Sequence, residues 1–129
     1  MVAIAIPVFS SQLEKSREAT DLANLRDCYA EITVAMMTDG LDQDGKTATV
    51  MNNLTATSKV DSSTGTITIS VPNFSISQSQ AKWQSDSHSV AGIEVADIDP
   101  IISSGTVTFV FTISGNNTNC TSINISSTT

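Results

Sequence analysis

One stretch near the N-terminus restricts the fold more than any other. From Ser10 to Met37 the chain contains neither glycine nor proline, and strong helix formers such as Ala, Leu, Glu, Lys and Arg are frequent. The sequence "TDG" follows, in which Gly40 is a natural helix C-cap. These features predict one long helix, which is about 35 residues or roughly 50 Å long if it begins near Ile4.

Apolar side chains recur along this helix at spacings that place them on one stripe. The stripe is wide and bulky enough to cover a sheet, and Cys28 lies at its edge. We therefore predict that it forms the contact between helix and sheet. Its members are Leu22, Leu25, Tyr29, Ile32 and Met36.

A second, narrower face of the helix carries Ala19, Ala23, Ala30 and Val34. Side chains of this size allow another helix to approach closely, although alanine is also frequent in helices simply because it has a high helix propensity.

Arg17 precedes Asp21 by four residues, so we also expect an ion pair within the helix.

The expected helix is longer than the domain, because a chain of 129 residues folds to a body about 30 Å across. Part of it should project, and residues 2–9, "VAIAIPVF", are the part least suited to water. This segment is too short for a bilayer, which needs about 20 apolar residues, and it lacks the basic region of a signal peptide. A protruding apolar end indicates a membrane or an assembly partner. We expect Pro7 to kink or locally break the helix there, and Ile4, Ile6, Pro7 and Val8 to belong to the assembly face.

The rest of the chain has the alternating pattern of antiparallel strands. Ile67, Ile69 and Val71 share one face of the first clear strand. In the second, we expect its alternate apolar residues to face inward: Val107, Phe109, Phe111 and Ile113. "GIEVAD" (92–97), "TSINIS" (121–126) and residues 47–57 are weaker candidates, and 47–57 also fits a short helix. Pro72 indicates an edge strand or a bulge.

The predicted fold class is therefore α+β, with the helix packed on an antiparallel sheet of about four strands. We divide the single domain into residues 1–9, the remnant of an apolar helix half; 10–38, the amphipathic half; and 39–129, a loop followed by the sheet.

The formal net charge of −7 makes nucleic acid an unfavourable partner. The two cysteines, Cys28 and Cys120, belong to no CxxC or Cys/His cluster, so a zinc site is not expected. They fit equally well one disulfide in an exported protein or two buried thiols. Cys120 is out of phase with Ile123 and Ile125 unless a bulge intervenes.

Other motifs give little support for chemistry. "DGLDQDGK" (39–46) resembles a calcium loop, but it has glycine at the first position and no glutamate at the twelfth. His88 lies in a polar stretch and is expected at the surface. A lone tryptophan such as Trp83 packs in the core more often than it binds a ligand. Because phosphate-loop, nucleophile and dinucleotide motifs are also absent from the sequence, we expect no catalysis, no metal and no cofactor.

The sequence "AIAIPVFSSQLEKSREATDLANLRDCYAEI" resembles the N-terminal helix of type IV pilins, especially those of Gram-positive bacteria. The resemblance covers about the first quarter of the chain, and it implies the type IV pilin fold. It implies a precursor whose leader is removed by a prepilin peptidase, and methylation of the new N-terminus. A further apolar segment would anchor the subunit in the membrane before assembly. The cleavage site and the glutamate of the family's apolar helix half are absent here, so the sequence looks like a truncated form.

As a major pilin, the full-length chain would form a homo-oligomeric helical filament with the help of a membrane-bound assembly machinery, whereas the truncated form would be a monomer. The expected location is an extracellular pilus, with a role in adhesion, motility, aggregation or DNA uptake. The alternatives are a pseudopilin of a type II secretion or competence system and, in another class, a carbohydrate-binding module with Trp83 at its site.

Overall fold

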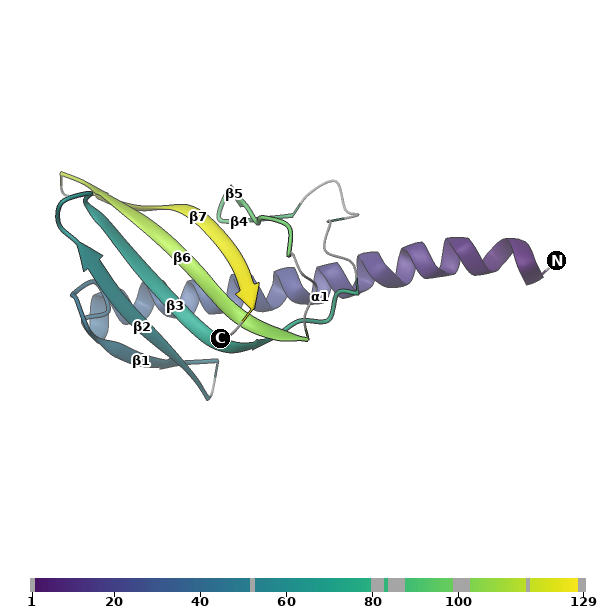
Figure 1. Cartoon of the computed structure of the whole chain (residues 1–129), viewed down its shortest axis with the longest axis horizontal. Coiled ribbons are helices and arrows are strands. Elements are labelled where there is room, and N and C mark those ends of the chain that lie inside the picture. The colour runs from purple at the N-terminus through teal and green to yellow at the C-terminus, as the bar shows by residue number, and fades with distance from the viewer. Residues whose placement is uncertain are drawn as a thin grey trace.

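The computed structural model describes residues 2–51, 53–79, 83, 88–98, 103–115 and 117–127, and for 2–11 and 127 it describes the backbone alone. One long helix lies against an antiparallel sheet, which confirms the α+β class (Figure 1). The elements in chain order are α1 (Val2–Thr38), β1 (Thr47–Val50), β2 (Leu54–Asp61), β3 (Thr66–Ser75), β4 (Ser89–Val90), β5 (Ile93–Glu94), β6 (Ser104–Ser114) and β7 (Asn117–Ser127).

The main sheet has five strands in the order β1-β2-β3-β6-β7, so the prediction of about four strands is wrong. The additional strand arises because residues 47–61 fold back on themselves as a hairpin, in which Val50 pairs with Leu54. Met51 permits the reversal by adopting a positive φ of 51°. "GIEVAD" contributes β5 to a separate two-stranded hairpin with β4, and Val95, which follows β5, forms a parallel bridge to Ile123 of the main sheet.

Pro72 lies in β3, which is a central strand, and it coincides with a bulge. The register between β3 and β6 shifts between Val71 and Phe74, and Asn73 there has a positive φ of 64°. The pairing of β3 with β2 reaches only to Ser70, so the missing N–H of Pro72 breaks no bond of the β2–β3 ladder. Of the two alternatives, the bulge is therefore confirmed.

The inner face of the sheet is built from the alternating residues of β3 and β6. Ile67, Ile69 and Val71 are buried, and so are Val107, Phe109 and Phe111. Ile113 was expected to face inward, but its side chain is 39% exposed. It pairs with the exposed Thr118 next to the β6–β7 turn, where the core ends.

The helix α1 runs without interruption from Val2 to Thr38, through Pro7, so of the expected kink or break at this proline the break is wrong. Gly40 ends the helix with a positive φ of 75°, and the N–H groups of Asp39 and Leu41 both donate to the carbonyl of Ala35. This arrangement is the expected C-cap. The C-terminal part of α1 lies against the sheet, and the N-terminal part extends well beyond it (Figure 1).

Candidate assembly surface

The sheet-facing side of α1 is the stripe that its spacing predicts. Leu22, Leu25 and Ile32 are buried, whereas Tyr29 and Met36 are partly buried against the same core. The ring of Tyr29 packs against Phe111 at a centroid distance of 6.1 Å and against Phe109 at 6.2 Å. The helix is thereby held with one defined side toward β6.

The opposite side of α1 is open to solvent. Ala19, Ala23, Ala30 and Val34 are all exposed, Val34 to 52%. At about 100° per residue these positions lie across the helix from Leu25 and Ile32. The alanines therefore do not pack inside their own domain, and we call Ala19, Ala23, Ala30 and Val34 the outer face of α1.

The remaining predicted assembly residues lie in the projecting end of α1. Ile4, Ile6, Pro7 and Val8 all have helical backbone, and their side chains lie outside what the structure describes. This end and the outer face belong to one continuous helix (Figure 1). An apolar contact can thus extend along α1 from its first turns to Val34.

Three acidic residues of α1 are buried, and the sequence analysis did not identify them. Glu14, Glu18 and Asp21 are each at most 2% exposed, on the same side of the helix as Leu25. The N–H groups of Ser77 and Gln78 donate to the two carboxylate oxygens of Asp21 at 2.9 and 3.0 Å. Asp21 thus faces the segment that follows β3, so the helix is covered beyond the end of the sheet.

Glu14 holds the next residue of that segment. Its carboxylate accepts the backbone N–H of Ser79 at 3.2 Å and the Ser79 hydroxyl at 2.6 Å. Arg17 lies 3.4 Å from the Glu14 carboxylate and donates to the Ser79 hydroxyl at 3.0 Å. The expected pair between Arg17 and Asp21 is not formed, because Asp21 is occupied by backbone donors. We call residues 77–79 the strap.

Two further polar residues of α1 attach other parts of the domain to the helix. Arg26 donates to the carbonyl of Ser89 at 3.1 Å, where β4 begins. Glu31 accepts the backbone N–H of Met51 at 3.0 Å, in the turn between β1 and β2. Together with the bonds to the strap, these two bonds attach α1 to segments near both edges of the sheet, the β4 hairpin beside β7 and the β1–β2 turn.

Burial sets the titration of several groups near the helix. The pKa of Asp21 is raised, because burial disfavours the charged carboxylate more than the two backbone N–H donors favour it. Burial also raises the pKa of Tyr29 and of Cys120, and it raises the pKa of Cys28 to about 12. The carboxylate of Asp61 has a lowered pKa, because the hydroxyl and N–H of Ser63 donate to it.

The two cysteines are free and buried, so the candidate disulfide between Cys28 and Cys120 is not formed in this structure. Cys120 reaches the core through a bulge: Val110 pairs with Ser122 but Phe111 pairs with Cys120, which leaves Thr121 as the extra residue. The bulge that the sequence required for Cys120 to share a face with Ile123 is thus confirmed.

Trp83 is buried, as expected for a lone tryptophan in the core. Its indole N–H donates to the carbonyl of Ala96 at 3.1 Å, and its ring stacks on His88 at 5.2 Å. His88 is half-buried, and its Nδ1 lies 3.1 Å from the carbonyl of Val95. His88 is therefore less exposed than expected for a surface histidine, because the stack covers one side of the imidazole.

The 39–46 loop serves the fold through backbone contacts. Asp44 accepts the N–H of Val60 at 2.9 Å, and the N–H of Gly45 donates to the carbonyl of Ser58 at 3.0 Å. Among the described residues, no three His, Cys, Asp or Glu side chains gather as metal ligands would.

Comparison of the chain with protein-family models, with curated proteins and with solved structures gives no match. In the part of the chain that the structure describes, no helix combines the length and the hydropathy that a bilayer crossing requires. The resemblance to type IV pilins therefore rests on the residues of α1 alone.

Proposed function

We propose that this chain is the major structural subunit of an extracellular filament of the type IV pilus kind, which polymerises through α1. The single observation that supports this proposal is the division of one uninterrupted helix into two sides. Leu22, Leu25 and Ile32 pack on their own sheet, while the outer face stays open and continues into the projecting apolar end.

Simple energetics favour such an arrangement. Burial of apolar surface contributes about 25 cal/mol per Å² before the costs of association. Small side chains bring two helix backbones close together, so that dispersion contacts add to this burial. Thr20 also fits a helix contact, because its hydroxyl donates to the carbonyl of Ser16 at 3.1 Å and is satisfied within the helix.

The proposed filament has a head-to-tail, heterologous contact, because the projecting end of one subunit must meet a different part of the next. The Thr-rich strands would then face outward. Thr55, Thr57 and Lys59 of β2 are exposed and alternate with the buried residues of that strand. Adhesion, surface motility, aggregation and DNA uptake all remain compatible with such a filament.

The test is to place charge on the outer face in cells that produce the full-length precursor. Ala19→Glu and Ala23→Glu should abolish filaments, because burying an unpaired carboxylate at a helix contact is strongly unfavourable. Thr57→Glu adds the same charge to an exposed strand position and should leave filaments intact. Immunogold electron microscopy with antibody to this chain gives the readout.

Folding of the isolated variants must be checked in parallel. We expect Ala19→Glu and Ala23→Glu to change stability by less than about 0.5 kcal/mol, because both sites are exposed and glutamate is a good helix former. Unaltered filaments in both variants would refute polymerisation through the outer face. Antibody labelling confined to the cell envelope, without long surface filaments in unmodified cells, would support the pseudopilin alternative instead.

The carbohydrate-binding alternative receives no support from Trp83, because its ring is covered by His88 and its N–H is already bonded to a carbonyl. A glycan array still separates the two classes. Tight binding that is lost in Trp83→Phe would favour the binding module.

A further inference from the structure

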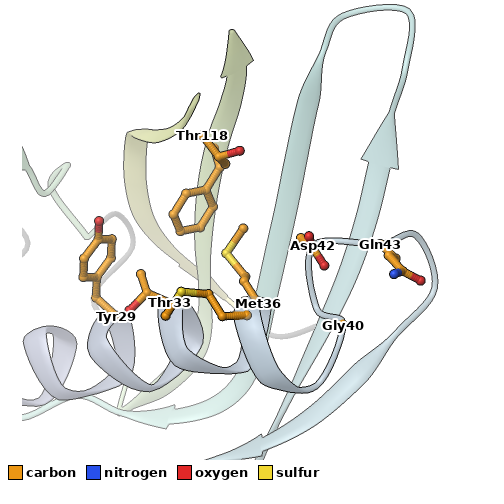
Figure 2. Close-up of a pocket in the computed structure, with 9 residues that line it drawn as sticks. Tyr29, Thr33, Met36, Gly40, Asp42, Gln43 and Thr118 are labelled. Atoms are coloured by element: carbon orange, nitrogen blue, oxygen red, sulfur yellow. The ribbon is translucent and has the colours of Figure 1, made fainter. Parts of the chain in front are cut away.

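A hollow of about 710 Å³ lies at the C-terminal end of α1, between the helix, the loop after it and the sheet (Figure 2). This volume is within the range of pockets that hold small molecules. Tyr29, Thr33 and Met36 line it from the helix, Asp42 from the loop and Phe111 from β6. With Thr118 of β7, four separate segments contribute its walls.

The apolar part of the hollow consists of two aromatic rings and two methionine side chains. The rings of Tyr29 and Phe111 are stacked, with 16° between their planes, and Phe111 is only 2% exposed, so the inner wall is fixed. Met36 lies beside them and is partly buried. Met37 also lines the hollow, yet its side chain is 81% exposed. Such a flexible, polarisable side chain can fold over a bound molecule.

The electrostatic character of the hollow is negative. Asp42 places a carboxylate at its rim, and Gln43 lies next to it (Figure 2). The helix ends there, and its last turn contains no basic residue to offset the partial negative charge of the terminal carbonyls. Among the described residues that line the hollow, none is basic. The hollow therefore favours a positive charge.

We propose that this hollow binds a small organic cation with apolar substituents, such as a quaternary ammonium compound. Tyr29 is only partly buried, so its ring can attract a cation through its quadrupole, with Phe111 stacked behind it, and the methionines contact the apolar groups of the cation. Asp42 provides the countercharge. The inference goes beyond the proposed filament and does not depend on it, because the residues of α1 that line the hollow belong to its C-terminal turns. The projecting end is the opposite end of this helix (Figure 1).

Methionine-methyl NMR of the intact chain tests this site directly. Met36 and Met37 line the hollow, whereas Met51 lies at the β1–β2 turn and serves as an internal reference. Titration with benzyltrimethylammonium should give saturable shifts of the Met36 and Met37 methyl signals and leave that of Met51 unchanged. Benzenesulfonate, an aromatic ion of similar size and opposite charge, should shift none of them.

A pair of charge-matched variants tests the role of the carboxylate. Asp42→Asn should weaken binding of benzyltrimethylammonium about fivefold, as expected for the loss of one partner of an exposed charge pair. Asp27→Asn removes the same charge from an exposed helix position outside the hollow and should bind normally. The proposal is overturned by any of three results: no saturable shift below about 20 mM, equal binding of benzenesulfonate, or an unchanged affinity in Asp42→Asn.

Discussion

At the scale of single residues, the acidic side chains of α1 fall into two groups that the sequence alone does not distinguish. Asp27 and Glu31 are exposed, whereas Glu14, Glu18 and Asp21 are almost completely buried. Buried charges need hydrogen-bond partners, and Asp21 finds two in the strap. The side-chain amide of Gln78, by contrast, is buried without a partner among the described residues. The strap is therefore held to α1 by the carboxylates of Glu14 and Asp21, and it contains one buried polar side chain, that of Gln78, without a hydrogen-bond partner among the described residues.

Asp21→Ala should destabilise the domain by about 2 kcal/mol, because it leaves two backbone N–H groups of the strap without an acceptor. The raised pKa adds a pH dependence. A group whose pKa is higher in the folded state stabilises most below its unfolded-state pKa, and this contribution is lost as the pH rises through the folded-state value. Urea unfolding should thus show a larger difference from the parent chain at pH 4 than at pH 8.

The control for this change is Asp27→Ala, which removes an exposed carboxylate from the same helix. Its effect should stay within about 0.5 kcal/mol. A loss in Asp21→Ala no greater than that of the control would mean that water replaces the carboxylate as acceptor.

Cys28 should be unreactive in the folded domain. Burial raises its pKa from 9.0 to about 12, so the nucleophilic thiolate does not form at ordinary pH. Because the folded state retains this proton while the unfolded state loses it, stability should fall as the pH rises from about 9 toward 12. In Cys28→Ala the free energy of unfolding should fall less over this pH range than in the parent chain.

Alkylation followed by mass spectrometry measures both cysteines at once. We expect no label on Cys28 in the native chain at pH 8 and label on both cysteines after unfolding without reductant. Protection of both thiols in unfolded, unreduced protein would show that Cys28 and Cys120 are bonded in solution.

At the scale of elements, three predictions that rest on a local pattern are confirmed. The spacing from Leu22 to Met36 identifies the buried side of α1, and the missing N–H of Pro72 identifies a bulge. The phase conflict between Cys120 and Ile123 identifies a second bulge. In each case the physical cause lies within a few residues of the signal.

The remaining features depend on partners that are distant in the sequence. Glu14 and Asp21 become buried only because the strap, more than fifty residues later, supplies donors. β1 and β2 were missed as separate strands because their inward residues include Ala48, Ala56 and Ser58, which give a weak apolar alternation. The hollow beside Met36 is formed by four segments that no single motif connects.

The bulge at Thr121 gives a prediction for β7 as an element. Deleting Thr121 should remove the bulge and leave Cys120 and Ile123 two residues apart, so both still face the core, because side chains alternate with a period of two. No buried side chain is displaced, so we expect the free energy of unfolding to change by about 1 kcal/mol or less.

Thr121→Ala is the matched control, because it keeps the bulge and removes only the hydroxyl contacts to Thr112 and to the carbonyl of Val110. It should cost about 1 kcal/mol or less. Denaturant unfolding followed by circular dichroism compares the two variants, and a loss of about 3 kcal/mol or more in the deletion alone would show that the fold needs the bulge itself.

At the scale of the whole molecule, the domain and the projecting end should be separable. The hydrophobic core of the described residues begins at Leu22. Glu14 is the first residue of α1 whose side chain accepts a hydrogen bond from the strap. Removal of residues 1–9 should therefore shift the melting temperature of the domain by less than about 3 °C.

In the full-length precursor, replacing Ile4 and Val8 by Asp should prevent assembly while leaving the folded domain intact.

Calorimetry of the shortened chain and electron microscopy of the precursor variant give the two measurements. A large drop in melting temperature on removal of residues 1–9 would mean that this end packs on its own domain. Normal filaments with Asp at both positions would mean that it takes no part in assembly.

The attachment of α1 also has a mechanical consequence. A pulling load that enters through the projecting end passes along the helix axis, and Glu14, Asp21, Arg26 and Glu31 transmit it to the strap, to β4 and to the β1–β2 turn. These bonds are spread along the direction of force, so they are loaded in shear and share the tension instead of opening one after another. Resistance to stretching then depends on how firmly the helix is fastened to the sheet.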